Sequence, residues 1–130
     1  MTLIDTNVLL DLFTNDPVWA AWSIGQLDAA RGALLINDVV YAELSVRFNT
    51  IEALEAVLQE AQIVPDPMPR EALFLAGKVF QQYRVAGGLR TGVLPDFFIG
   101  AHAAVAGWPL LTRDVQRYRT WFPTLVLIAT

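Results

Sequence analysis

The sequence has 130 residues, the length of one ordinary domain, and its mean hydropathy of +0.42 and 55% hydrophobic content are high for a small globular chain. Charged residues, Pro or His interrupt every apolar stretch before the ~18–20 residues that a membrane-spanning helix needs, and the start has no basic region typical of a signal peptide. The absence of Cys excludes disulfides and thiolate metal sites and is typical of a cytoplasmic protein.

The composition and charge of the chain also indicate what kinds of macromolecule it can bind. The apolar excess suggests that some surface is buried against a partner or a second copy of the chain. The formal net charge of −4 argues against a generally basic nucleic-acid surface. Arg113, Arg117 and Arg119 nevertheless form a local cluster that can hold phosphate, and the alternative is a solvated helix face.

Short apolar runs alternate with helical patterns along the whole chain. The predicted strands are residues 2–4, 33–36, 62–64, 110–111 and 124–128. The predicted helices between them are residues 8–13, 17–30, 39–49, 51–61, 70–86, 95–106 and a short helix from about 115. Three prolines within 65–69 predict a loop there, and the glycine-rich segment 86–92 predicts another.

Several residues mark where the predicted helices begin and end. Asn37 or Asp38 can cap the helix over 39–49, and Thr50 can cap the next helix. Pro95 is favoured in the first turn of its helix, and Gly107 is expected to end that helix. The helix over 70–86 is predicted to place four apolar residues on one face, namely Leu73, Ala76, Phe80 and Tyr83.

Strands that are apolar on both faces and alternate with helices predict a parallel sheet with helices on both sides. The predicted fold class is therefore α/β, as a three-layer α/β/α sandwich with five parallel strands. In such folds ligands bind outside the carboxyl ends of the strands, where the strand order reverses.

Four acidic residues follow predicted strands on that side of the sheet. Asp5 directly follows the first strand, Glu43 lies in the first turns of the helix after the second, Asp96 begins the helix at Pro95, and Asp114 follows the fourth strand. Individually these acids can be explained as helix caps, as complements of a helix dipole, or as a surface acid. Together, four carboxylates from four segments can converge on one point.

Converging carboxylates repel one another and are usually held by a cation. An all-oxygen set suits Mg²⁺ or Mn²⁺, whereas a zinc site is not expected with no Cys and one His, His102. Such a metal activates water for attack on phosphorus. No Ser–His or Cys–His pair and no P-loop is found, because Gly87-Gly88 lacks the Lys-Ser/Thr that a P-loop requires.

Four segments carry a resemblance to a known family: Leu3–Asp11 (LIDTNVLLD), Val40–Leu44 (VYAEL), Leu94–Ala103 (LPDFFIGAHA) and Leu110–Asp114 (LLTRD), with Tyr118 and Phe122-Pro123 after them. In this order they resemble the PIN-domain ribonucleases, and more narrowly the VapC toxins of bacterial toxin–antitoxin (VapBC) pairs. The resemblance implies a single PIN domain over residues 1–130. It also implies a Mg²⁺-dependent endoribonuclease, with Mn²⁺ as a possible substitute, that cleaves RNA by metal-activated water.

The resemblance also assigns roles to individual residues. Its catalytic and metal-binding acids match Asp5, Glu43, Asp96 and Asp114, and its orienting polar residues match Asn7 and Thr112. Arg113 and Arg117 are candidates for RNA contacts. The implied partners are a cognate antitoxin, which often presents Arg to the acids, and a second copy of the chain in a homodimer. Asp38 departs from the family pattern and is explained by helix capping.

Three other functions are compatible with parts of the pattern. A phosphatase with an aspartate nucleophile would need a second Asp two residues after Asp5, where this chain has Asn7. A phospho-receiver domain would need a pair of acids after the first strand and a late Lys, and the only Lys is Lys78. A non-catalytic PIN-like binding module would not need all four acids.

Overall fold

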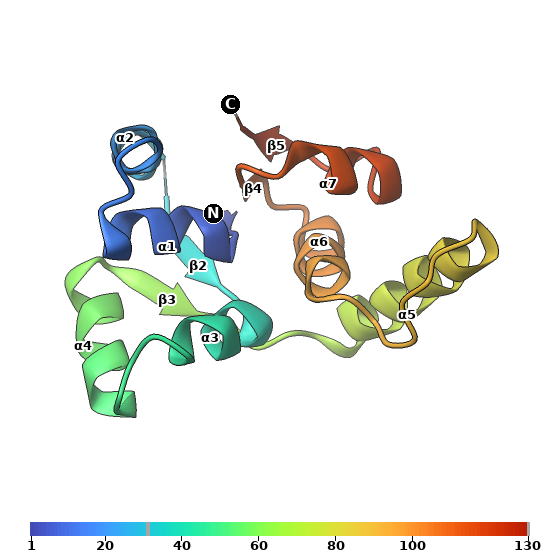
Figure 1. Cartoon of the computed structure of the whole chain (residues 1–130), viewed down its shortest axis with the longest axis horizontal. Coiled ribbons are helices and arrows are strands. Elements are labelled where there is room, and N and C mark those ends of the chain that lie inside the picture. Colours follow the sequence, from blue (N-terminus) through green and yellow to red (C-terminus); the bar gives the residue numbers. More distant parts are fainter. Residues whose placement is uncertain (31, 130) are drawn as a thin grey trace.

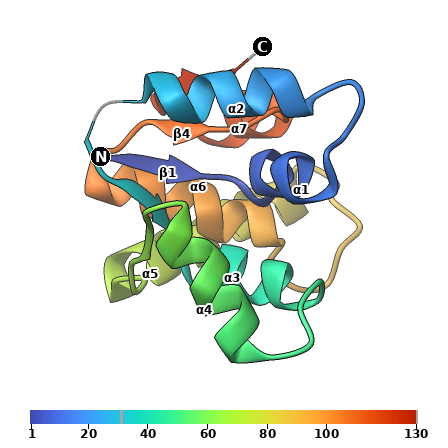
Figure 2. The same ribbon diagram turned by 90° about the vertical axis from the view of Figure 1, so that its left-hand side faces the viewer.

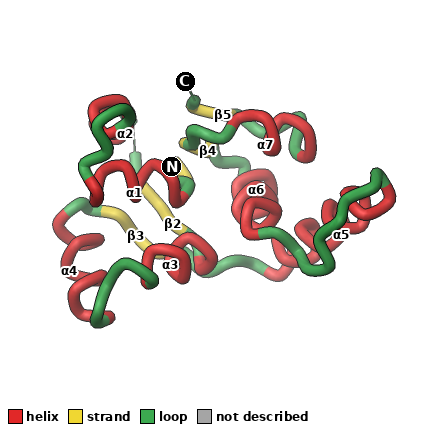
Figure 3. The backbone as a smooth tube through the Cα atoms, in the orientation of Figure 1, coloured by secondary structure: helices red, strands yellow, loops and turns green. Residues whose placement is uncertain are grey.

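The computed structural model describes residues 1–30 and 32–129, and its centre is a five-stranded parallel sheet (Figures 1 and 3). The strands are β1 (Thr2–Ile4), β2 (Leu34–Ile36), β3 (Ile63–Pro65), β4 (Leu110–Leu111) and β5 (Leu127–Ile128). Their order across the sheet is β3-β2-β1-β4-β5. The predicted α/β/α sandwich with five parallel strands is confirmed.

Helices cover both sides of this sheet. They are α1 (Thr6–Thr14), α2 (Ala20–Ala29), α3 (Asp38–Ser45), α4 (Ile51–Glu60), α5 (Arg70–Val85), α6 (Pro95–Ala106) and α7 (Val115–Trp121). In Figure 1, α1, α2 and α4 lie on one side of the strands, and α5, α6 and α7 lie on the other. The rotated view in Figure 2 shows β1 and β4 enclosed between helices. None of the helices within the described residues is long and apolar enough to cross a bilayer.

The predicted caps form as hydrogen bonds. Oδ1 of Asn37 accepts from the backbone N–H of Val40 at 2.9 Å, so Asn37 and not Asp38 caps α3. Oγ1 of Thr50 accepts from the backbone N–H of Ala53 at 3.1 Å. Helix α6 begins at Pro95 and ends at Gly107, whose φ of 72° gives the left-handed cap that glycine adopts without strain.

Three element boundaries and one helix face differ from the predictions. Helix α2 begins at Ala20 and not at Pro17, because Oδ1 of Asp16 accepts from two backbone N–H groups and holds the preceding residues in a turn. Helix α3 ends at Ser45, and the last strand covers only two of the five residues predicted for it. Leu73 is exposed, because α5 buries the stripe of Ala72, Ala76 and Val79.

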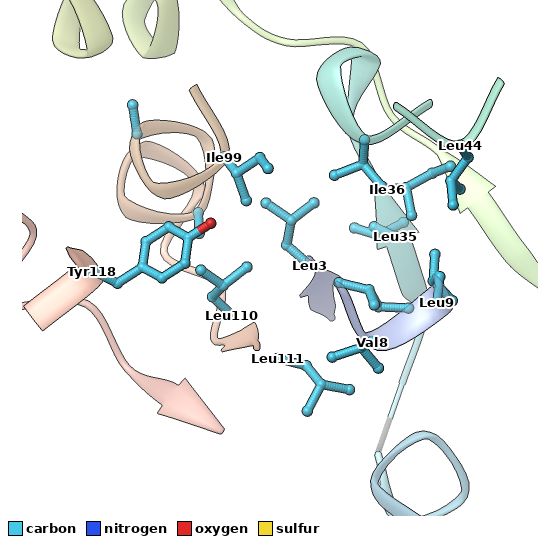
Figure 4. Close-up of a cluster of buried hydrophobic side chains, with 14 of the residues drawn as sticks. Leu3, Val8, Leu9, Leu35, Ile36, Leu44, Ile99, Leu110, Leu111 and Tyr118 are labelled. Carbon is cyan, nitrogen blue, oxygen red and sulfur yellow. The ribbon is translucent and has the colours of Figure 1, made fainter. Parts of the chain in front are cut away.

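The core surrounds the central strands β1 and β4. Leu3, Leu110 and Leu111 are fully buried, and Figure 4 shows Leu3 beside Ile99 of α6, Leu110 beside Tyr118 of α7, and Leu111 beside Val8 of α1. The strand order reverses between β1 and β4, since β2 and β3 follow on one side and β5 on the other. The carboxyl ends of β1 and β4 are therefore the place where a ligand is expected.

Candidate acidic site

Asp5 lies where the carboxyl ends of β1 and β4 meet. Its backbone N–H donates to the carbonyl oxygen of Leu111 at 2.9 Å, and its side chain is only 4% exposed. Oδ1 accepts from the backbone N–H of Thr6 at 2.7 Å. Oδ2 accepts from the hydroxyls of Thr112 at 2.7 Å and Tyr118 at 3.1 Å. The carboxylate is thus fixed in one orientation by donors from three elements of the fold.

The protonation of Asp5 reflects this burial. Desolvation raises its pKa from 3.8 to about 6, and the negative charge of Asp96 adds to the increase. The hydrogen bonds from Thr112, Tyr118 and Thr6 lower the pKa and so offset part of the shift. Asp5 therefore stays ionised at neutral pH, although at a cost that a nearby cation would remove.

Asp96 lies close to the same hydroxyl, and the charge of Asp114 acts on both Asp96 and Tyr118. Asp96 is in the first turn of α6, and its Oδ1 is 3.5 Å from the Tyr118 hydroxyl. Burial raises the pKa of Asp96, Arg117 lowers it, and Asp114 raises it. The Tyr118 pKa is raised well above 10, first by burial and then by the charges of Asp5, Asp96 and Asp114. The buried phenol thus lies between the carboxylates of Asp5 and Asp96, and the charge of Asp114 also acts on it.

Glu43 is connected to this group through Thr6. The Thr6 hydroxyl donates to Oε1 of Glu43 at 2.7 Å, while the Thr6 backbone N–H donates to Asp5. The side chain of Glu43, on α3, is therefore held at the start of α1. Thr6 therefore links Glu43 to Asp5.

Asn7 and Thr112 brace the loop that carries Asp114. Nδ2 of Asn7 donates to Asp5 at 3.4 Å, and its Oδ1 accepts from the backbone N–H of Arg113 at 3.3 Å. Oγ1 of Thr112 accepts from the backbone N–H of Asp114 at 3.0 Å while donating to Asp5. Both residues therefore lie where an orienting role was expected of them.

The two candidate RNA-binding arginines are both engaged with carboxylates. The guanidinium of Arg113 makes two hydrogen bonds with buried Asp11, at 2.6 and 2.9 Å, and its Cζ lies 4.9 Å from the centre of the Trp19 ring. Nη1 of Arg117 lies 3.0 Å from Oδ2 of Asp96. Arg113 therefore links α1 to the loop before α7, whereas Arg117 lies at the acidic site itself.

Two residues of the site were not singled out from the sequence. Tyr118 was quoted only as part of a family motif, and Thr6 only as a neighbour of Asp5. The position of Tyr118 four residues after Asp114, on the buried face of a short helix, is the signal that could have found it. No sequence pattern indicated that Thr6 would bond to a residue 37 positions away.

The donor set of the site fits a hard divalent cation. All four acids offer oxygen ligands, and the pKa of Asp5 is raised first by burial and then by the negative charge of Asp96, both of which a bound cation would oppose. Among residues 1–30 and 32–129, however, no three acidic or imidazole groups are grouped closely enough to hold a metal as they stand. Two of the four carboxylates instead contact partners within the chain, Glu43 through Thr6 and Asp96 through Arg117.

Solved structures similar to this fold come from several bacteria. VapBC2 from Rickettsia felis, bound to a promoter DNA fragment, matches at TM-score 0.73 and 18% identity, covering 99% of this chain and 98% of that chain. VapBC-1 from nontypeable Haemophilus influenzae matches at TM-score 0.73 and 21% identity, covering 98% of this chain and 96% of that chain. A toxin–antitoxin complex from Klebsiella pneumoniae matches at TM-score 0.72 and 22% identity, covering 97% of this chain and 96% of that chain.

At these identities the structural matches show a shared fold. No curated protein matches the sequence at a significant level. The sequence itself matches the PIN domain family over residues 2–120, which is most of its length. The family match and the fold agree with one another, and the chain belongs to the PIN-domain family.

Proposed function

We propose that this protein is a Mg²⁺- or Mn²⁺-dependent endoribonuclease and the toxin of a VapBC-type toxin–antitoxin module. The observation that supports the proposal is that the Tyr118 hydroxyl lies 3.1 Å from the Asp5 carboxylate and 3.5 Å from that of Asp96, at the strand-order reversal of a PIN fold. Such a cluster is costly for the fold unless a cation offsets its charge.

The four acids would hold the metal, and the rest of the site would position them. When bound, Mg²⁺ or Mn²⁺ supplies a Lewis acid that lowers the pKa of water and stabilises charge on the leaving oxygen. Thr112, Tyr118 and Thr6 fix the orientation of the Asp5 carboxylate before substrate arrives. Asp96 is only partly buried and has a raised pKa, so its carboxylate is the best placed to accept a proton from the attacking water.

An aspartyl-phosphate mechanism is less compatible with this geometry. Asp5 is 4% exposed, and both of its oxygens already accept hydrogen bonds. A nucleophilic carboxylate would need an open path to phosphorus. Asn7, where a phosphatase would have its general acid, donates to Asp5 and has no proton to transfer to a leaving group.

The proposed partners are RNA, a cognate antitoxin and a second copy of the chain. The similar structures from Rickettsia felis and Haemophilus influenzae are VapBC structures. Several large apolar side chains are also exposed, which supports burial against other proteins. They are Val18, Val46, Ile51, Phe74, Val85 and Leu89.

Cleavage of RNA by the purified protein tests the proposed activity. We expect cleavage with Mg²⁺ or Mn²⁺, none with EDTA, and a loss of at least about 100-fold in Asp5→Asn, since removing a metal ligand impairs the catalytic ion itself. Asp38→Asn is the matched control, because Asp38 also follows a strand but bonds only to the backbone N–H of Met68. Full activity in Asp5→Asn would contradict the proposal and favour a non-catalytic role.

Expression in bacteria tests the toxin assignment separately. We expect the wild-type chain to arrest growth, Asp5→Asn to be harmless, and co-expression of the neighbouring gene to restore growth. Arrest that the neighbouring gene does not relieve, in a strain where RNA is cleaved, would indicate a nuclease that is not part of a toxin–antitoxin pair.

A further inference from the structure

Arg117 places a positive charge inside the acidic site. Its Nη1 lies 3.0 Å from Oδ2 of Asp96, and this is the one ion pair that any of the four acids makes within residues 1–30 and 32–129. Asp114 immediately precedes the same helix, and Tyr118 follows Arg117 along it. Helix α7 therefore brings to one place a candidate metal ligand, the phenol between the carboxylates, and the cation that pairs with Asp96.

The Arg117 contact is loose in comparison with the neighbouring arginine. Arg113 is held by two hydrogen bonds to buried Asp11, and its side chain is 27% exposed. Arg117 makes a single hydrogen bond, and its side chain is 43% exposed. An ion pair with this exposure is weak and easily exchanged. Arg117 can therefore leave Asp96 without disturbing the core.

Arg117 also uses a carboxylate oxygen that a cation would need. Asp96 cannot give Oδ2 to a divalent ion while that oxygen accepts from the guanidinium, so the two positive partners compete. The structure shows the state in which the chain supplies its own cation. Once released, a guanidinium beside the acids is suited to bind a phosphate with two hydrogen bonds.

We propose that Arg117 is an internal, displaceable counter-cation, which neutralises Asp96 until a divalent ion binds and then contacts an RNA phosphate beside the site. This inference rests on the proposed function, which supplies the metal and the RNA. It adds a coupling between them: Arg117 becomes available to RNA only when Asp96 is given to the metal. Coupling of this kind is reciprocal, so RNA should also favour metal binding.

The first test measures Mn²⁺ binding by calorimetry in the absence of RNA. We expect Arg117→Gln to bind Mn²⁺ about two- to five-fold more tightly than wild type, because a competing weak ion pair is removed. Arg117→Lys keeps the charge and should remain close to wild type. Arg119→Gln is the matched control, since Arg119 is exposed on the same helix and makes no ion pair with any described carboxylate. Equal Mn²⁺ affinities in Arg117→Gln and Arg119→Gln would show that Arg117 does not compete with the metal for Asp96.

The second test measures kinetics on a single-stranded RNA that the wild type cleaves, at saturating Mn²⁺. We expect Arg117→Gln to raise KM about three- to ten-fold with little change in kcat, and to reduce the salt dependence of KM by about one phosphate contact. Arg117→Lys should recover part of the loss. A KM in Arg117→Gln no higher than in Arg119→Gln would overturn the transfer to phosphate.

These measurements separate failure of the inference from failure of the proposed function. Wild-type protein that binds no Mn²⁺ would overturn both. Wild-type protein that binds Mn²⁺ but cleaves no RNA would overturn the proposed activity and the RNA contact, while the calorimetry would still decide whether Arg117 competes with the metal. If the wild type cleaves RNA, and Arg117→Gln has the same Mn²⁺ affinity and the same KM as the wild type, the inference about Arg117 is overturned while the proposed function stands.

Discussion

The Asp5 carboxylate is held among donors from Thr6, Asn7, Thr112 and Tyr118, in a position that is 4% exposed. Four donors would ordinarily lower the pKa of a carboxyl group. Here burial and the charge of Asp96 outweigh them, and the pKa rises to about 6. The residue is therefore a charged, well-oriented carboxylate at the expense of the stability of the metal-free protein.

This balance predicts a pH-dependent gain in stability for Asp5→Asn without metal. Because the folded-state pKa is about 6 against 3.8, protonated Asp5 stabilises the fold below pH 3.8, and this contribution is lost as the pH rises through about 6. The shift corresponds to at most about 3 kcal/mol, and Asn loses some hydrogen bonds. We expect Asp5→Asn to be about 1–2 kcal/mol more stable than wild type at pH 7.5 in EDTA.

Urea unfolding at pH 7.5 and pH 5 measures this effect. The difference between Asp5→Asn and wild type should shrink at pH 5, where the wild-type carboxyl is largely protonated. The same difference at both values would show that burial of charge is not its cause. Asp38→Asn serves as a control, since Asp38 is an exposed carboxylate near a strand end.

At the scale of elements, Arg113 joins the loop before α7 to helices α1 and α2. Asp11 is buried, and besides Arg113 it accepts a hydrogen bond from Ser23 of α2 at 3.0 Å. Removing the guanidinium would leave this carboxylate buried without a cation. The guanidinium of Arg113 thus neutralises buried Asp11 and stabilises the fold. Its direct contact with RNA remains a prediction.

We expect Arg113→Met to destabilise the fold by about 2–3 kcal/mol, less than for a fully buried pair because Arg113 is 27% exposed. Chemical denaturation measures the loss, and Asp11→Asn combined with Arg113→Met should recover part of it, since no charge then remains buried. A loss of stability below about 0.5 kcal/mol in Arg113→Met, together with a large fall in RNA affinity, would indicate that Arg113 binds RNA and does not support the fold.

Gly100 controls how closely α6 approaches the end of α7. A Cβ at this position would lie 2.6 Å from ring carbons of Phe122, whereas a Cβ at Gly77 of α5 would meet nothing within 4 Å. We expect Gly100→Ala to cost about 1–3 kcal/mol through overpacking, and Gly77→Ala to add about 0.5–1 kcal/mol of helix propensity. Thermal unfolding of the two variants gives the comparison. A stabilising Gly100→Ala would mean that Phe122 moves without cost.

The elements themselves were largely predictable because their signals are local. Asn37 and Thr50 cap the helices that they precede, and Pro95 and Gly107 bound α6, since each acts within a few residues. The exposed position of Leu73 was not predictable in this way. It depends on which face of α5 packs against the rest of the chain. The face that packs is the one that carries Ala72, Ala76 and Val79.

At the scale of the molecule, the parallel sheet itself brings the acids together. Asp5 and Thr112 are 107 positions apart, yet the pairing of β1 with β4 puts their side chains 2.7 Å apart. The rule for strand ends predicted that side chains following β1 and β4 would lie near one another, whereas the role of Thr112 came only from the family resemblance. It could not predict that Tyr118 would stand between the acids or that Arg117 would hold Asp96. Those contacts depend on how α7 is rotated against the sheet.

The assembled charge predicts that divalent ions stabilise the whole fold. Binding to the folded state alone adds about 1.4 kcal/mol at ten times Kd, which is a rise in Tm of roughly 5 °C for a chain of this size. We expect this shift with Mn²⁺ in wild type, a larger one at the same Mn²⁺ concentration in Arg117→Gln, and almost none in Asp96→Asn, because the competing cation or the ligand is removed. KCl at matched ionic strength controls for screening. An equal shift in wild type and Asp96→Asn would place the ion elsewhere on the molecule.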